Sequence, residues 1–233
     1  MSPGRKHQRV PCGVKVEFRS ASAFLISYAT NLSRGGMFLE TTATLDAGTE
    51  LALTIEVPGH GAVQVPARVA WTRAAELGGL RGMGLEFSEV AGEVGRVIDE
   101  LVGAFEGVQV ALLSRDGRSS VSVGRAIRAA IASAEIVEVT EVALLEAVCD
   151  DCELVIIDAD SEADGGSRAL AMVRSQNPPL PAIVLSAVSE RRERAERAGA
   201  ISLGIPPAAG ELGKAALAAL SQPIAVEVDD QKD

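Results

Sequence analysis

The first part of the chain alternates apolar and polar residues in short runs. In the segment 50–57, for example, Leu51, Leu53, Ile55 and Val57 fall on one face of an extended chain. A period of two is typical of a strand with one buried side. Six segments are predicted as strands on this basis: Val10 to Phe18, Ala23 to Thr30, Met37 to Glu40, Glu50 to Val57, Ala62 to Trp71 and Gly82 to Phe87. Strands this short and closely spaced favour a small antiparallel barrel.

The period changes after the last of these strands. Apolar residues from Val90 to Phe105 recur at steps of three and four, which predicts an amphipathic helix. From Val108 onward, uninterrupted apolar runs alternate with helical segments. The predicted strands are Val108 to Leu113, Glu135 to Val139, Leu154 to Ile157 and Ala182 to Leu185, and the predicted helices are Val121 to Ala134, Val142 to Val148, Ser167 to Ser175, Glu190 to Ala198 and Ala208 to Leu220. This alternation indicates an α/β domain with a parallel sheet covered on both faces.

These patterns divide the 233 residues into two domains. The all-β barrel with its following helix spans residues 1–106, and the α/β domain spans residues 107–222. Residues 223–233 are acidic and polar and are expected to be disordered. The chain is long enough for each domain to bury its own core.

Charge is distributed unevenly between the two domains. The net charge of -10 argues against general binding to DNA. Residues 1–39, however, include six basic residues and one acidic residue, which gives this segment a net charge of +5. From Gly107 to the end, 12 basic and 20 acidic residues give -8. An anionic ligand is therefore expected at the N-terminal end.

Cysteine usage indicates a reducing compartment. The chain has three cysteines, an odd number, and neither a signal peptide nor a long apolar run precedes them. A cytoplasmic protein without membrane insertion is expected. Cys149 and Cys152 have the C-x-x-C spacing, but the two histidines, His7 and His60, lie far away in the sequence. A redox or metal role for this pair is disfavoured, and no metal site is expected.

Two short segments carry the candidate binding chemistry. Arg5 and Arg9 provide two guanidinium groups four residues apart, suited to two phosphates or to guanine edges. Asn31 and Ser33 place polar side chains at alternate positions, and Gly36 lets a ligand approach the main chain. A solvated basic tail and a plain turn are the alternative interpretation of the same residues.

Together these segments resemble the PilZ domain family, whose signature is R-x-x-x-R followed by [D/N]-x-S-x-x-G. Segments 67–71 and 82–87 are similar to later barrel strands of the family. The resemblance covers about residues 1–105 and implies a receptor for cyclic di-GMP held by Arg5, Arg9, Asn31, Ser33 and Gly36. Trp71 is interpreted as a core or rim residue rather than a base-stacking platform.

The second half resembles the flavodoxin-like receiver domain of response regulators. On this resemblance, Asp158 falls on the phosphoacceptor position and Ser186 on the switch hydroxyl position. Ser114 and Arg115 stand where the family has an acidic pair for magnesium, and Ile205 stands where it has a lysine. A degenerate pseudo-receiver is predicted, in which Arg115 could neutralise Asp158.

An acidic loop and an arginine-rich helix complete the candidates. Asp158, Asp160, Glu162 and Asp164 have only part of the spacing of a calcium loop, so a solvated loop is preferred. The helical segment 190–198 interleaves arginine and glutamate and is interpreted as a salt-bridged solvent surface, with a partner-binding face as the alternative.

The resulting functional hypothesis is a bacterial cyclic di-GMP receptor that couples nucleotide binding to protein–protein interactions in motility, pilus or exopolysaccharide regulation. One alternative is a PilZ adaptor that docks partners independently of the nucleotide. Another is a response regulator phosphorylated on Asp158. No cofactor and no enzymatic activity are expected, because no P-loop, nucleophile motif or metal-ligand set occurs in the sequence. The sequence specifies neither the partner protein nor the oligomeric state.

Overall fold

The computed structural model describes residues 12–32, 36–74, 81–88, 93–164, 166–208 and 210–230. The chain forms two compact units, one comprising Met1–Phe105 with Gln222–Asp233 and the other Glu106–Ser221. The second unit is thus an insertion within the first. Two connections join the units, one near Phe105 and one near Gln222.

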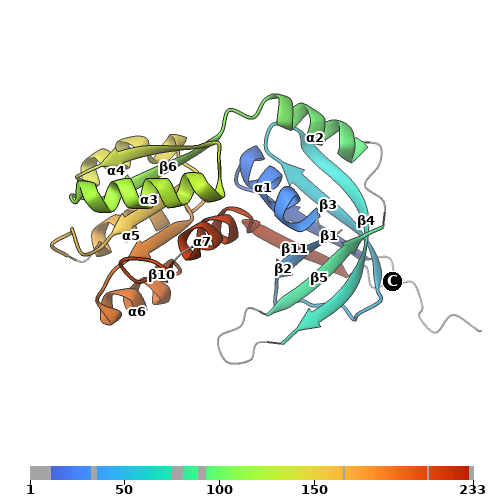
Figure 1. Cartoon of the computed structure of the whole chain (residues 1–233). Helices are drawn as coiled ribbons and strands as arrows, with labels where there is room; N and C mark the ends of the chain where they lie inside the picture. The colour runs from blue at the N-terminus through green and yellow to red at the C-terminus, as the bar shows by residue number, and fades with distance from the viewer. Residues whose placement is uncertain are drawn as a thin grey trace, which may run out of the picture. The chain divides into compact units, whose positions relative to one another are not determined.

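The first unit is built around a curled sheet of six strands (Figure 1). Its order is β11-β1-β3-β4-β5-β2. The strands are β1 (Cys12–Glu17), β2 (Gly36–Glu40), β3 (Glu50–Val57), β4 (Gly61–Arg73), β5 (Gly82–Phe87) and β11 (Ala225–Asp230), and the helices are α1 (Ala21–Leu32) and α2 (Glu93–Gly103). All neighbouring strands are antiparallel except the parallel pair β1 and β3.

Alternation along these strands builds the core of the unit. Leu53, Ile55 and Val57 of β3 are buried, as are Val63 and Val65 of β4. The apolar positions thus face one side and the polar positions face the other, as the period of two requires. The expected barrel class is confirmed in the form of a curled, mostly antiparallel half-barrel.

The segment predicted as a strand from Ala23 to Thr30 is instead helix α1, so that prediction is wrong. The hydroxyl of Ser20 accepts a hydrogen bond from the Ala23 amide at 3.0 Å and caps the helix. Phe24 packs edge-on against Phe18 and lies one helical turn from Tyr28, with ring centroids 6.0 Å apart. The apolar run lacks the strict alternation of a strand, and its contacts follow the helical period.

The expected disordered tail is also corrected, because residues 225–230 form strand β11. The strand pairs antiparallel with β1 along its whole length, from Cys12 opposite Asp230 to Glu17 opposite Ala225. Val226 and Val228 pack against the core, while charged residues occupy the alternating positions. A half-buried edge strand satisfies this pattern despite its acidic composition. Residues 231–233 lie outside the described part of the chain.

The second unit is a parallel sheet with helices on both faces. Its strands are β6 (Val108–Leu113), β7 (Ala134–Val139), β8 (Leu154–Asp158), β9 (Ala182–Leu185) and β10 (Ile201–Leu203). Its helices are α3 (Gly117–Ala130), α4 (Val142–Val148), the 3-10 turn η1 (Cys149–Asp151), α5 (Ser167–Arg174), α6 (Ser189–Arg197) and α7 (Glu211–Leu220). Helix α3 packs against α7, and α4 packs against α5 (Figure 1).

The strand order β10-β9-β8-β6-β7 identifies the fold of this unit. Numbered within the unit it reads 5-4-3-1-2, which is the flavodoxin-like order of doubly wound sheets. The predicted fold class is therefore confirmed. Helix α3 begins four residues earlier than the apolar pattern predicted, because the Asp116 side chain accepts a hydrogen bond from the Arg118 amide and caps it.

Helix α2 covers the central part of the segment predicted from Val90 to Phe105, and residues 89–92 lie outside the described part of the chain. None of the helices in the described ranges has both the length and the apolar character that a membrane-spanning helix requires.

Candidate functional site

The predicted ligand residues are only partly described by the structure. Arg5, Arg9 and Ser33 lie outside the described residues. Asn31 lies near the end of α1, and Gly36 is the first residue of β2. The grouping of these residues around a nucleotide therefore stays a prediction.

Gly36 has a clear structural requirement for glycine. It pairs with Glu86 of β5, and an added Cβ would overlap the main-chain carbonyl of Leu85. Any larger residue would push β2 away from β5. The sequence analysis expected Gly36 to let a ligand approach the main chain. The contact with Leu85 shows that glycine is also required here for close packing of β2 against β5.

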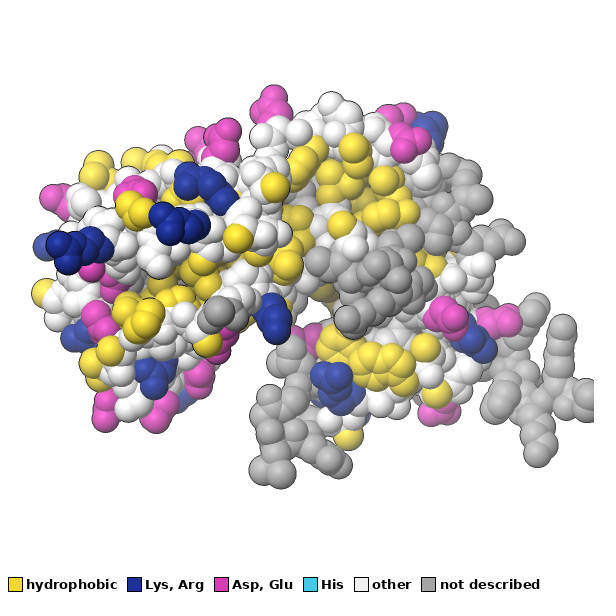
Figure 2. All heavy atoms as spheres, in the orientation of Figure 1, with side chains coloured by type: hydrophobic (Ala, Val, Ile, Leu, Met, Phe, Trp, Pro, Cys, Tyr) yellow, Lys and Arg dark blue, Asp and Glu magenta, His cyan; other side chains and the backbone are white. Residues whose placement is uncertain are grey.

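The outer face of β2, β4 and β5 carries three side chains that we call the aromatic patch: Phe38, Trp71 and Arg73. The rings of Phe38 and Trp71 stack with centroids 5.3 Å apart and planes inclined by 13°. The guanidinium carbon of Arg73 lies 5.2 Å from each ring centroid. Figure 2 shows apolar side chains gathered on the outer face of this unit beside a basic side chain. A planar, electron-rich surface of this kind suits stacking by another flat group.

Two glycines make room for the patch. Both Phe38 and Trp71 stand opposite Gly84 in the strand register, and Arg73 stands opposite Gly82. An added Cβ on Gly84 would overlap the Trp71 ring, and one on Gly82 would lie 2.6 Å from the Phe38 ring. Atoms of both rings therefore occupy space that a side chain at Gly82 or Gly84 would fill. The alternate glycines of the Gly82-Met83-Gly84 run are the only part of this arrangement that the sequence itself displays.

Trp71 lies at the surface because of an irregularity in β4. The register shifts between Val69 and Trp71, so one residue of β4 is unpaired. Val69 is buried, and simple alternation would have placed Trp71 inside as well. The bulge reverses the phase and leaves Trp71 43% exposed. The interpretation as a core residue is wrong, whereas the rim position agrees with the structure.

The second unit gathers polar side chains at the carboxyl ends of its strands. Asp158, the last residue of β8, is only 4% exposed. Its Oδ2 accepts a hydrogen bond from the Ser114 hydroxyl at 2.8 Å, and its Oδ1 accepts from the amides of Asp160 and Ser161 at 3.2 and 3.3 Å. Asp158 lines a cavity of about 400 Å³ together with Asp116, Asp160 and Ile205.

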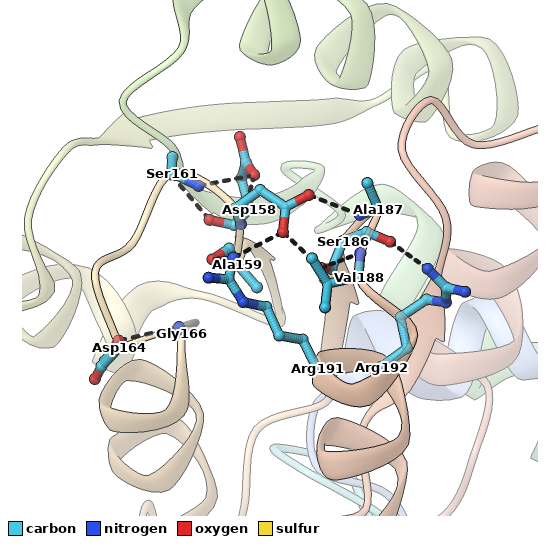
Figure 3. Close-up of polar contacts among 11 residues, drawn as sticks. Asp158, Ala159, Ser161, Asp164, Gly166, Ser186, Ala187, Val188, Arg191 and Arg192 are labelled. Atoms are coloured by element: carbon cyan, nitrogen blue, oxygen red, sulfur yellow. Dashed lines mark hydrogen bonds and ion pairs between the residues drawn. The ribbon is translucent and has the colours of Figure 1, made fainter.

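Ser186 points toward Asp160 rather than toward Asp158. Its hydroxyl donates to Oδ1 of Asp160 at 2.6 Å and accepts from the Val188 amide at 3.0 Å. The Ala187 amide donates to the other oxygen of Asp160 at 2.6 Å, and Arg191 donates to Oδ1 at 2.8 Å. Figure 3 shows this network at the ends of β8 and β9.

Asp160 is held in its charged form by these contacts. Burial alone would raise its pKa, but the hydrogen bonds from Ser186, Ala187 and Arg191, together with the charge of Arg191, outweigh that effect. The pKa of Asp160 is therefore lowered from its ordinary value of 3.8. The sequence interpretation treated this carboxylate as part of a solvated loop and missed its role.

Arg115 does not neutralise Asp158 as expected. Its Nε lies 3.2 Å from Oε1 of Glu162 and also donates to the Thr140 carbonyl at 3.2 Å. Glu162 is only 6% exposed, and this ion pair places a guanidinium beside its buried carboxylate. The hydroxyl of Ser114 takes the place beside Asp158 that Arg115 was expected to fill.

The other acidic residues at this edge of the sheet make contacts of their own. Asp116 caps α3, Asp160 binds Ser186 and Arg191, and Asp164 accepts from the amides of Gly166 and Arg168. Within the described ranges, no group of three or more His, Cys, Asp or Glu side chains is placed to hold a metal ion. Each of these carboxylates has a local partner in the protein.

Two further sequence candidates, the cysteine pair and the arginine-rich helix, lie in the second unit. Cys149 and Cys152 are both buried in the core of the second unit. Helix α6 is not simply a salt-bridged surface, because Arg191 pairs with Asp160 and Arg192 donates to the Ser186 carbonyl at 2.7 Å. Part of its arginine content therefore serves the loops beside it.

Comparison with known proteins found one matching family model. Residues 3–104 match the model of the PilZ domain family. A search of the curated proteins found no relative of this chain. Among solved structures, a protein whose name associates it with pilus assembly, from Burkholderia thailandensis E264, is 20% identical over 49% of this chain and 99% of its own, with a TM-score of 0.42.

A response regulator receiver protein from Pseudoalteromonas atlantica is 18% identical over 48% of this chain and 96% of its own, with a TM-score of 0.43. Because both TM-scores lie below 0.5, the fold of the second unit is assigned from its strand order.

Proposed function

We propose that this chain is a cyclic di-GMP receptor whose curled-sheet unit binds the nucleotide. The family match over residues 3–104 and the motif residues Arg5, Arg9, Asn31, Ser33 and Gly36 support this function. The observation that supports it most strongly is the alternation along β2. Met37 and Leu39 are buried, so Gly36 and Phe38 lie on the opposite, outward face of the strand. The motif thus leads directly onto the aromatic patch.

In this proposal, the two arginines and the patch recognise different parts of the ligand. Arg5 and Arg9 bind phosphate oxygens or guanine edges, because each guanidinium donates paired hydrogen bonds. Asn31 and Ser33 hydrogen-bond one guanine. Contrary to the interpretation of Trp71 from the sequence, its exposed ring beside Phe38 and Arg73 offers a surface on which a guanine ring stacks.

We further propose that the second unit is a pseudo-receiver that transmits the signal by binding a partner protein. Ser114 occupies the place beside Asp158, and Ile205 lies in the cavity where a cation would stabilise a phosphoryl group. The output in motility, pilus or exopolysaccharide regulation, and a cytoplasmic location, belong to this proposal. An adaptor that docks partners without nucleotide is the competing function.

The test is binding of labelled cyclic di-GMP to the full chain and to an Arg5→Ala, Arg9→Ala variant. A second double variant, Arg125→Ala, Arg128→Ala, removes the same charge from an exposed face of α3 and serves as the control. Binding that survives in the control and disappears in the first variant supports the receptor. Equal binding by both variants would show that Arg5 and Arg9 do not contact the nucleotide. No binding by the unaltered chain would favour the adaptor.

A Trp71→Ala variant separates the patch from the motif. We expect its affinity to fall about tenfold, because a stacked base contributes roughly 1–3 kcal/mol. Unchanged affinity would show that the patch lies outside the nucleotide site.

A further inference from the structure

The three donors around Asp160 form a site for an oxyanion. They are a hydroxyl from Ser186, a main-chain amide from Ala187 and a guanidinium from Arg191. Donors of these kinds converge where proteins bind phosphate or carboxylate. In this chain, both carboxylate oxygens of Asp160 occupy the site, with all three donor–acceptor distances between 2.6 and 2.8 Å.

We propose that Asp160 is a permanent internal ligand of this oxyanion site, which latches the loop after β8 to the loop after β9 without any phosphoryl group. Asp160 lies in the first loop, whereas Ser186 and Ala187 lie in the second and Arg191 in α6. Strands β8 and β9 are neighbours, with Asp158 opposite Leu185, so the two loops start side by side.

Further contacts tie the same two loops together. Arg191 also donates to the Ala159 carbonyl at 2.9 Å, and Arg192 donates to the Ser186 carbonyl at 2.7 Å. Ser186 is fully buried, so its hydroxyl proton is committed to Asp160 with no competing water. The side chains of Asp160 and Arg191 are partly exposed, at 29% and 30%, so the buried Ser186 hydroxyl is the part of the latch that lies in the protein interior.

The latch has a direct consequence for Asp158. A phosphoryl group on Asp158 could reach the Ser186 hydroxyl and the Ala187 amide only by displacing the Asp160 carboxylate, which is bound to both. Asp158 itself accepts from the main-chain amide of Asp160, so the phosphoacceptor position and the latch lie two residues apart and are directly linked. A second anion there would face electrostatic repulsion. The second unit is therefore fixed in one state at this edge, independently of phosphorylation.

The test is hydrogen exchange of residues 186–192 in the full chain, in an Asp160→Ala variant and in an Asp164→Ala control. Asp164 lies in the same loop but caps α5 instead of reaching β9. We expect exchange in Asp160→Ala to be about tenfold faster or more, given the loss of charged hydrogen bonds, and unchanged in the control. Exchange in Asp160→Ala as slow as in the unaltered chain would overturn the proposal.

Inorganic phosphate provides the second readout. Added at millimolar concentration, it should restore protection of residues 186–192 in Asp160→Ala and leave the unaltered chain unchanged. Phosphate that protects the unaltered chain equally would show that the site is not already occupied and would overturn the proposal.

If Asp160→Ala does not fold, Ser186→Ala provides a milder variant, because it removes one donor only. It should accelerate exchange of the Ala187 amide, and no acceleration would likewise contradict the latch.

Discussion

At the scale of single residues, glycines decide where the largest side chains lie. Gly84 leaves the space that the Trp71 ring fills, and Gly36 allows β2 to approach β5. Neither glycine has a positive φ, so the requirement is space rather than backbone conformation. The exposed aromatic patch thus depends on the absence of a side chain at Gly82 and Gly84 of β5.

Substituting Gly84 tests this requirement. Gly84→Ala should displace the Trp71 ring and lower the free energy of unfolding by about 1–3 kcal/mol, as overpacking does. Urea denaturation followed by the emission of Trp71, the single tryptophan of the chain, measures both effects. Gly13→Ala in β1 is the matched control, because a Cβ there meets nothing within 4 Å. If the two variants have the same free energy of unfolding, the Trp71 ring can move aside without loss of stability, which would contradict the prediction.

The charge of Asp160 gives a pH-dependent contribution to stability. Its pKa is lower in the folded state than the ordinary 3.8, since its hydrogen bonds and Arg191 favour the charged form over the opposing effect of burial. The stabilisation is therefore complete above about pH 4 and is lost as the pH falls through the folded-state value. In urea denaturation from pH 6 to pH 3, the stability difference between the unaltered chain and Asp160→Asn should shrink below pH 4. A difference that stays constant would contradict this assignment.

At the scale of elements, the sequence predicts most strands and helices but not every one. Period-two alternation was sufficient for β3 and β4, and uninterrupted apolar runs were sufficient for β6, β8 and β9. The hydrophobic pattern gave the wrong prediction for α1, because five apolar or aromatic residues nearly in succession suit either a strand or a helix. The Ser20 cap, which settles the choice in the structure, is visible in the sequence.

The same limit explains what was missed at the candidate sites. The bulge in β4 that turns Trp71 outward depends on pairing with β5, which a local pattern does not contain. The contact between Asp160 and Ser186 joins residues 26 positions apart and depends on β8 and β9 being neighbours. The motif residues, in contrast, were identified by their resemblance to the PilZ signature, and their roles stay predictions.

Strand β11 makes a further prediction at this scale. A chain ending at Pro223 lacks the strand, exposes the edge of β1 and loses the packing of Val226 and Val228 on the core. Its free energy of unfolding should fall by about 2 kcal/mol or more, from apolar burial and ladder hydrogen bonds together. A chain ending at Asp230, which keeps the strand, is the control. If both truncated chains unfold at the same urea concentration, β11 contributes nothing to stability.

At the scale of the whole molecule, the parallel-sheet unit is inserted between two parts of the curled-sheet unit. The chain leaves the first unit near Phe105 and returns near Gln222 to supply β11. In the proposed function, the first unit detects the nucleotide and the second binds a partner. Two covalent connections, rather than one flexible linker, then join the sensing and output units.

The most direct measurement of the central claim is calorimetric titration of the full chain with cyclic di-GMP. We expect binding in the micromolar range or tighter, about 8 kcal/mol, which a few charged hydrogen bonds and one stacked base can supply. We also expect that the Arg5→Ala, Arg9→Ala variant shows no binding. Absence of binding by the unaltered chain at high micromolar nucleotide would contradict the receptor.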